Sequence, residues 1–168
     1  PSNSLPDTVT PLSQGGPCNC PPGYGTVNGT LSSCEPCSPG KYKVNSGPSP
    51  CLTCGSLSLY CPGMRNILPK QIPAGYIGVG DSNETLHAVQ ECSGGIACMS
   101  GEKLMTCPIG KYSTNASGMC TECEAGYYND KEEQISCDTP CEAGKYSLKG
   151  ASFCQQCPAG RYSNQSGL

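Results

Sequence analysis

The chain has 168 residues, of which 16 are cysteines, and its 10 basic and 13 acidic residues give a net charge of −3. Leu, Ile, Val and Phe together number 23 and Trp is absent, so the apolar surface is too small for an ordinary globular core. The charges are scattered without runs and indicate neither nucleic acid nor an anionic membrane as a partner. Cysteine at close to one residue in ten is typical of small secreted domains that disulfides hold together.

Residues 1–17 form the first segment and contain four prolines with several Ser and Thr, but no apolar period of two or 3.6. We expect an extended linker with O-linked glycans on its hydroxyls, or a stretch that packs along the next module. No apolar run approaches the roughly 20 residues of a membrane span, and no signal peptide precedes the segment. Since disulfides and glycans require the secretory route, we expect the sequence to be an excerpt of a longer precursor.

Two cysteine-rich repeats follow in residues 18–54, opening as Cys20-Pro-Pro-Gly-Tyr and Cys37-Ser-Pro-Gly-Lys-Tyr. Pro or Ala before Gly favours a tight turn with positive φ at Gly, and the residues around Tyr have strand propensity. Closing such a loop with a disulfide removes about 3 kcal/mol of unfolded-chain entropy. Each unit is therefore predicted to be a stapled hairpin, with an irregular first copy because Tyr24 follows Gly23 directly.

Residues 55–106 are an irregular insert, where the close pairs Cys54/Cys61 and Cys92/Cys98 flank a cysteine-free run from Pro62 to Glu91. The run contains seven Ile, Leu and Val residues that favour a small β-rich pad or hairpin. They are Ile67, Leu68, Ile72, Ile77, Val79, Leu86 and Val89. The run includes Pro73-Ala-Gly-Tyr but lacks the cysteine that opens the other units.

Residues 107–168 contain three regular repeats and the beginning of a fourth, which indicates an array. Gly and Tyr recur at fixed distances from each opening cysteine, as in Gly110 and Tyr112 or Gly144 and Tyr146. The predicted fold is small and disulfide-rich, an extended tandem array of short β-hairpin-like units with little hydrophobic core.

Sequential pairing of the cysteines is the simplest arrangement, although spacing alone does not fix the connectivity. The pairs would be Cys20 with Cys34, Cys37 with Cys51, Cys54 with Cys61, Cys92 with Cys98, Cys107 with Cys120, Cys123 with Cys137, and Cys141 with Cys154. Cys18 and Cys157 remain single in this scheme, and we expect both to form disulfides with neighbouring sequence.

A zinc site is the alternative for some of these cysteines, because the pairs Cys34/Cys37 and Cys51/Cys54 nearly fit a four-cysteine ligand set. Against zinc, the same Cys-x2-Cys spacing is the junction between consecutive units at Cys120/Cys123 and Cys154/Cys157. Four Asn-x-Ser/Thr sequons also point to the oxidising secretory pathway. These are Asn28, Asn83, Asn115 and Asn164, all expected to be exposed N-glycosylation sites. We therefore expect disulfides, and no metal or other cofactor.

No catalytic constellation is recognisable in the sequence. His87 is the sole histidine, no nucleophile motif surrounds a serine, and no Asp-rich calcium loop is present. We predict that the chain is not an enzyme.

The motif Cys-x-x-Gly-x-Tyr-Ser, followed by Gly or Ser and then Cys-x-x-Cys, resembles the ephrin-receptor-like cysteine-rich repeats. It covers residues 107–168 and, less regularly, 20–54. These repeats are related in style to tumour-necrosis-factor-receptor and growth-factor-receptor cysteine-rich modules. The stretch between Tyr60 and Cys98 is similar to variant arrays in very large surface proteins of algae and other protists. The resemblance implies a rod of stacked small β units with consecutive disulfides.

Two functions follow as hypotheses. The first is a structural segment of a large glycosylated extracellular protein, such as a stalk or filament subunit, whose partners are the neighbouring modules of its own chain, further copies or other extracellular proteins. The second is a ligand-binding receptor or adhesion ectodomain, with a contact surface around Ile67, Leu68, Tyr76 and Ile77. Self-association would favour the first hypothesis, and a monomer with one large exposed apolar patch the second.

Overall fold

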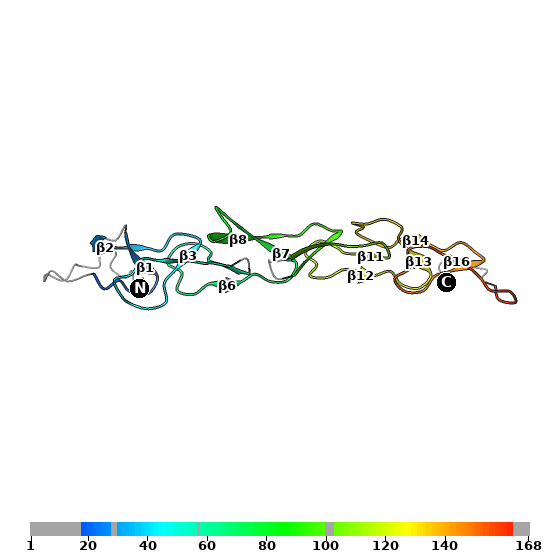
Figure 1. Ribbon diagram of the computed structural model, residues 1–168, viewed down its shortest axis with the longest axis horizontal. Coiled ribbons are helices and arrows are strands. Elements are labelled where there is room, and N and C mark those ends of the chain that lie inside the picture. The colour runs from blue at the N-terminus through cyan, green and yellow to red at the C-terminus, as the bar shows by residue number, and fades with distance from the viewer. Residues whose placement is uncertain (1–17, 28–29, 57, 100–102, 163–168) are drawn as a thin grey trace, which may run out of the picture. The chain divides into compact units, whose positions relative to one another are not determined.

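The structure is a computed structural model, and it describes residues 18–27, 30–56, 58–99 and 103–162, without the side chains of residues 30–32 and 103. The predicted linker, residues 1–17, and the sequons at Asn28 and Asn164 lie outside the described residues. Short strands and turns make up the described ranges, which contain no helix (Figure 1). This part of the chain accordingly offers no helical segment suited to crossing a bilayer.

The chain divides into two compact units. Unit 1 contains Pro1–Gln71 and Gly78–Ala88, and unit 2 contains Ile72–Ile77 and Val89–Leu168. The strands of unit 1 are β1 (Tyr24–Val27), β2 (Thr30–Pro36), β3 (Lys41–Tyr42), β4 (Leu52–Thr53), β5 (Leu59–Tyr60) and β6 (Lys70–Gln71). The strands of unit 2 are β9 (Ile96–Met99), β10 (Lys103–Thr106), β11 (Lys111–Tyr112), β12 (Thr121–Glu122), β13 (Tyr127–Tyr128), β14 (Thr139–Pro140), β15 (Lys145–Tyr146) and β16 (Gln155–Gln156). Two further strands, β7 (Tyr76–Gly80) and β8 (Leu86–Glu91), contribute residues to both units.

Within the described ranges, the strands form two-stranded sheets. In the regular repeats the first strand holds the residues at and before the tyrosine position, and the second strand holds the two residues before the next opening cysteine. Tyr42 thus pairs with Leu52 and Lys41 with Thr53, and Tyr112 pairs in the same way with Thr121. The Cys-x2-Cys junction is therefore a two-residue strand. This explains why its length recurs along the chain.

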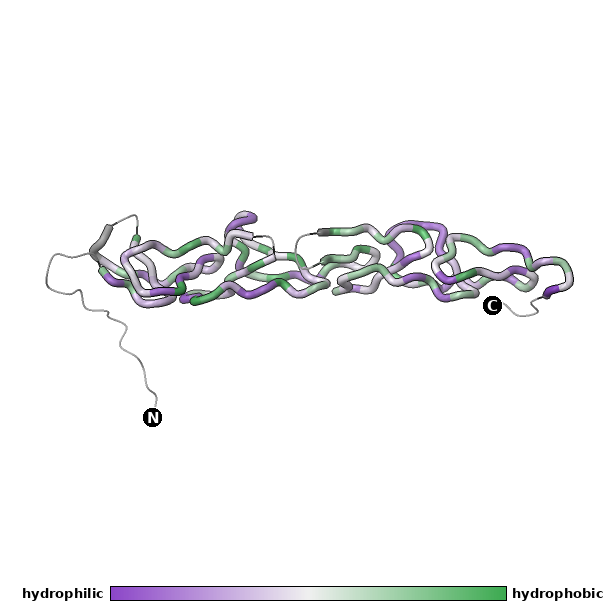
Figure 2. Tube along the Cα trace, turned by 60° about the horizontal axis from the view of Figure 1, so that its bottom comes forward, coloured by the Kyte–Doolittle hydropathy of each residue, from purple (hydrophilic) through white to green (hydrophobic). Residues whose placement is uncertain are grey.

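Disulfides occupy the places that a hydrophobic core would fill in a larger domain. Of the buried apolar residues in the described ranges, nine are cysteines, and the others are Ile72, Leu86 and Ala97. Figure 2 shows hydrophilic and hydrophobic segments alternating along the tube without an extended apolar block. The predicted class, a small disulfide-rich tandem array of β hairpins with little core, is confirmed.

Candidate functional site: the contact between repeats

Seven disulfides join the same cysteines as the sequential pairing described above. They are Cys20–Cys34, Cys37–Cys51, Cys54–Cys61, Cys92–Cys98, Cys107–Cys120, Cys123–Cys137 and Cys141–Cys154. The four cysteines of the alternative zinc site, residues 34, 37, 51 and 54, are all in these disulfides and leave no thiolate for a metal. Cys18 and Cys157 are half-buried and unpaired. The disulfides indicate an oxidising compartment.

Consecutive repeats are joined by a backbone hydrogen bond from the turn glycine, the third residue after the opening cysteine. Its N–H donates to the carbonyl of one position in the next repeat, which we call the buried position because its side chain is enclosed. The bonds are Gly23 to Lys43 (2.9 Å), Gly40 to Cys61 (3.0 Å), Gly75 to Cys98 (2.8 Å), Gly95 to Ser113 (2.8 Å), Gly110 to Asn129 (2.7 Å) and Gly126 to Ser147 (3.1 Å). Each of these six acceptor residues is at most 7% exposed.

The carbonyl of the turn glycine makes a second bond of this kind, because it accepts the N–H of the next opening cysteine. The donors are Cys37, Cys54, Cys92, Cys107, Cys123, Cys141 and Cys157, at 2.8–3.0 Å. One glycine residue therefore bonds through both its N–H and its C=O to the following repeat. This arrangement satisfies the backbone of a chain whose strands are too short to do so alone.

The turn glycine also touches the repeat after next. Gly110, at φ +78°, faces Gly150 so closely that a Cβ would lie 2.1 Å from the Gly150 carbonyl oxygen. A Cβ on Gly75, at φ +87°, would lie 2.0 Å from the carbonyl oxygen of Ala116. Ala116 itself has positive φ, and its N–H donates to the Cys92 carbonyl at 2.9 Å. Within each unit, a repeat is thus in contact with both of the repeats that follow it.

The segment 55–106 follows the same bonding scheme, although its sequence does not show which residues take the positions of the regular repeats. Ile72 takes the place of an opening cysteine three residues before Gly75, and its side chain is fully buried like those cysteines. Cys61 and Cys98 occupy the buried position, so their disulfides connect the opening cysteine to that position instead of to a closing cysteine. The segment contains the hairpins β5–β6 and β9–β10 and the paired strands β7 and β8.

In the first repeat the tyrosine stands one residue earlier than in the others, so a glycine takes the usual tyrosine position. Gly25 occupies the tyrosine position, and a Cβ there would lie 2.4 Å from the backbone nitrogen of Cys51. Thr26 then fills the buried position at 6% exposure. A groove of about 430 Å³ lies beside β1 and β2, with Glu35 and Lys41 as the charged groups in its lining.

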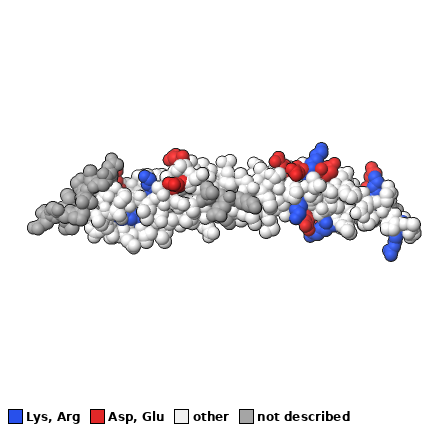
Figure 3. Space-filling model, in the orientation of Figure 1, with Lys and Arg blue, Asp and Glu red and all other residues white. Residues whose placement is uncertain are grey.

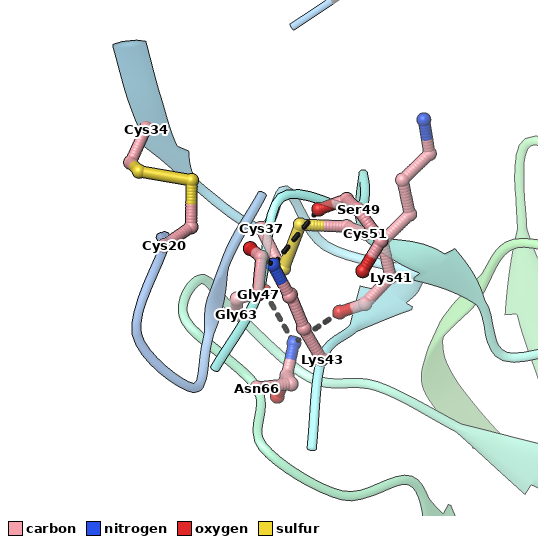
Figure 4. Close-up of a disulfide and its surroundings, with 10 residues drawn as sticks. All are labelled: Cys20, Cys34, Cys37, Lys41, Lys43, Gly47, Ser49, Cys51, Gly63 and Asn66. Atoms are coloured by element: carbon pink, nitrogen blue, oxygen red, sulfur yellow. Dashed lines mark hydrogen bonds between the residues drawn. A yellow bond between two sulfur atoms is a disulfide. The ribbon is translucent and has the colours of Figure 1, made fainter. Parts of the chain in front are cut away.

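Lys43 is the exception at the buried position, where other repeats carry Thr, Ser, Asn or Cys. Its side chain is 3% exposed, and its ammonium donates to the carbonyl oxygens of Gly47 at 2.5 Å and Ser49 at 2.8 Å (Figure 4). Burial lowers the pKa of Lys43 below its ordinary value. Beside it, the Asn66 amide donates to the carbonyls of Lys41 (3.2 Å) and Gly63 (3.0 Å). In the sequence, a charge at the position after Lys-Tyr is the one mark of this lysine, and the pattern of Cys, Gly and Tyr does not predict its burial.

The two described sequons have exposed asparagines. Asn83 lies between β7 and β8, in a turn where the Ser82 and Thr85 hydroxyls are 2.9 Å apart. Asn115 also contacts the preceding repeat, because its Oδ1 accepts the N–H of Gly94 at 2.8 Å. That bond uses the amide oxygen, so the amide nitrogen that would carry a glycan makes no part of it.

Residues of the hypothetical ligand surface fall in both units. In unit 1, Ile67 and Leu68 are 52% and 61% exposed in the connection between β5 and β6, together with Met64 at 61%. Tyr76 and Ile77 belong to unit 2 and are half-buried, and the Tyr76 hydroxyl lies 3.4 Å from Glu91 Oε1.

Charged side chains form exposed pairs of opposite sign. The Nζ to carboxylate distances are 3.3 Å for Lys111–Glu122, 2.9 Å for Lys145–Glu142 and 3.5 Å for Lys149–Glu124. The hydrogen bond from Lys145 lowers the pKa of Glu142 below its ordinary value. On the face in Figure 3, basic and acidic groups are interspersed, and most of the surface is uncharged. Exposed pairs of this kind contribute little stability, so the electrostatics do not mark one region as a binding site.

His87 and the carboxylates near it in the sequence do not form a catalytic or metal-binding cluster. His87 is half-buried in β8, and Asp81, Glu84 and Glu91 are exposed. Within the described ranges, no three His, Cys, Asp or Glu side chains are grouped as metal ligands would be.

Comparison with known proteins gives no assignment: no family model matches the chain, and no curated protein does so either.

Proposed function

We propose that this chain is a non-catalytic structural segment of a large glycosylated extracellular protein, a stalk or filament subunit built from ephrin-receptor-like cysteine-rich repeats. One observation carries the proposal: the turn glycine bonds to the next repeat and touches the one after it, as at Gly110, Asn129 and Gly150. A contact that recurs along the array suits a protein whose length is set by the number of repeats.

The disulfides and exposed charges support this proposal. Each regular hairpin is closed by its own disulfide, which resists unfolding and proteolysis. Glycans at Asn83 and Asn115, both exposed, would shield neighbouring short strands from pairing with other chains. The interspersed charges give no single-sign field that would attract a charged macromolecule.

The test is solution scattering on the secreted protein, with non-reducing peptide mass spectrometry on the same sample. We expect the distance distribution of a thin rod, whereas a compact chain of this length has a radius of gyration of about 15 Å. The peptides should contain the seven disulfides and sugar on Asn83 and Asn115. A compact particle with bare asparagines would refute the proposal.

A ligand-binding ectodomain is the second candidate, favoured by the exposed apolar residues Met64, Ile67 and Leu68. Sedimentation over a concentration series separates the two functions. A filament subunit self-associates, whereas a receptor segment stays monomeric, and its binding to a cell surface is lost when Ile67 and Leu68 are changed to Ser. The change Val79→Ser, at another exposed apolar residue of unit 1, is the control.

A further inference from the structure

The stretch from Pro62 to Glu91 is the longest part of the array that no disulfide encloses. It begins after the Cys54–Cys61 disulfide and ends before the Cys92–Cys98 disulfide. The next longest such stretch between Cys20 and Cys154 is residues 99–106, and the remaining ones are junctions of two or three residues. When the chain is pulled, each disulfide carries the tension and protects the loop that it closes. Residues 62–91 have no disulfide and are held only by non-covalent contacts.

Those contacts are hydrogen bonds and packing, and some reach other repeats, as from the Arg65 N–H to the Cys37 carbonyl at 2.9 Å. Ile72, in the place of an opening cysteine, and Leu86 are the buried aliphatic side chains of the stretch. Backbone bonds hold it to the flanking disulfides, from the Cys61 N–H to the Leu86 carbonyl and from the Cys92 N–H to the Gly75 carbonyl, both 2.9 Å. Because the flanking repeats also have almost no apolar core, the absence of a cross-link distinguishes this stretch and gives it the lowest cost of local opening.

We propose that residues 62–91 are an extension element: under tension this stretch unfolds first and reversibly, while the disulfides keep the flanking hairpins closed. The released length is limited, because the chain becomes taut between Cys61 and Cys92. The inference deepens the proposed structural function and rests on it, since a stalk is where tension would reach the stretch.

The experiment is single-molecule stretching of the oxidised full chain, held by tags at its two ends. From Cys61 to Cys92 there are 31 residue steps, which correspond to a contour length of about 110 Å when fully extended. We expect the first unfolding event to release this length, less the folded distance between the two cysteines, and to reverse when the force is lowered. A first event of about 30 Å, the contour length of the nine steps from Cys98 to Cys107, would overturn the proposal.

A matched variant restores the missing staple. In repeats with a two-residue junction, the closing cysteine stands three residues before the next opening cysteine, which for Cys92 is position 89. Ile72→Cys with Val89→Cys therefore adds a disulfide where the regular repeats have one. With this bridge formed, as checked by peptide mass, the first event should shorten by about 55 Å. An unchanged event length would contradict the assignment to residues 62–91.

Amide hydrogen exchange on the unmodified protein gives a second test that needs no variant. Peptides from residues 62–91 should exchange faster than peptides from residues 107–154, because local opening is cheaper where no disulfide restricts the chain. Equal or slower exchange would overturn the proposal. The scattering and glycan results test the structural function separately: a compact, unglycosylated protein would refute that function even if the first event has the expected length.

Discussion

At the scale of single residues, Lys43 shows how the array tolerates a buried charge. A buried lysine normally requires a carboxylate partner or loses its proton. Here, two backbone carbonyls from the loop of the same repeat, at Gly47 and Ser49, accept the ammonium hydrogens. The lysine thereby ties that loop to the contact between the first two repeats, since the Lys43 carbonyl accepts the Gly23 N–H.

Replacing Lys43 with Met should lower the free energy of unfolding by about 1–2 kcal/mol, because Met keeps the aliphatic stem but donates to neither carbonyl. The neighbouring change Lys41→Met, at a half-buried lysine in β3, should alter it by less than about 0.5 kcal/mol. Denaturant unfolding with disulfides intact measures both. Equal losses for the two variants would mean that the Lys43 hydrogen bonds contribute nothing specific.

The lowered pKa of Lys43 gives this contribution a pH dependence. Between the folded pKa and the ordinary value of 10.5, the unfolded chain binds more protons than the folded one, so stability rises with pH across that window. The neutral amine retains two N–H groups for the two carbonyls. The stability difference between the unmodified protein and Lys43→Met should therefore grow from pH 7 to pH 10, measured with Cys18 and Cys157 alkylated. A difference that shrinks would place the pKa shift in the opposite direction.

Asn115 combines a sequon with a contact to the preceding repeat. Asn115→Asp removes the glycan site but keeps an oxygen acceptor for the Gly94 N–H, whereas Asn115→Ala removes both. In unglycosylated protein, we expect Asn115→Ala to cost about 1 kcal/mol and Asn115→Asp less than half of that. Thermal unfolding of the two variants provides the comparison. Equal stability would show that the bond is dispensable.

At the scale of the repeat, the contact between one turn glycine and the repeat after next is testable with a matched pair. Gly110 and Gly144 have similar φ values, +78° and +83°, but a Cβ would meet the Gly150 carbonyl at Gly110 and nothing within 4 Å at Gly144. Gly144→Ala should therefore cost only the left-handed strain of about 1–2 kcal/mol. Gly110→Ala should cost about 1–3 kcal/mol more, because the backbone of another repeat must shift. If denaturant unfolding gives equal losses, the close approach is not part of the stability.

The sequence predicted those features of the repeat that are local. A Pro-Gly or Ala-Gly turn after a cysteine and the spacing of Gly, Tyr and Cys are sufficient to place hairpins, as in residues 107–154. The register of residues 55–106 was not predictable, because Ile72 replaces a cysteine and Cys98 moves to the buried position. Neither was the second strand at the junction, or the contact at Gly110. Those features depend on residues tens of positions away, which a local pattern does not report.

At the scale of the whole molecule, stability should depend on disulfides and on no metal. The described chain buries few aliphatic side chains, whereas closing a loop of this size contributes about 3 kcal/mol. Addition of a thiol reductant should therefore abolish the folded state at room temperature, seen as loss of chemical-shift dispersion, while a chelator such as EDTA should change nothing. The zinc alternative predicts the reverse pattern, with folding sensitive to the chelator and indifferent to the reductant. Because each reagent acts on one type of cross-link, the pair of spectra separates an array stapled by sulfur bonds from one assembled around a metal.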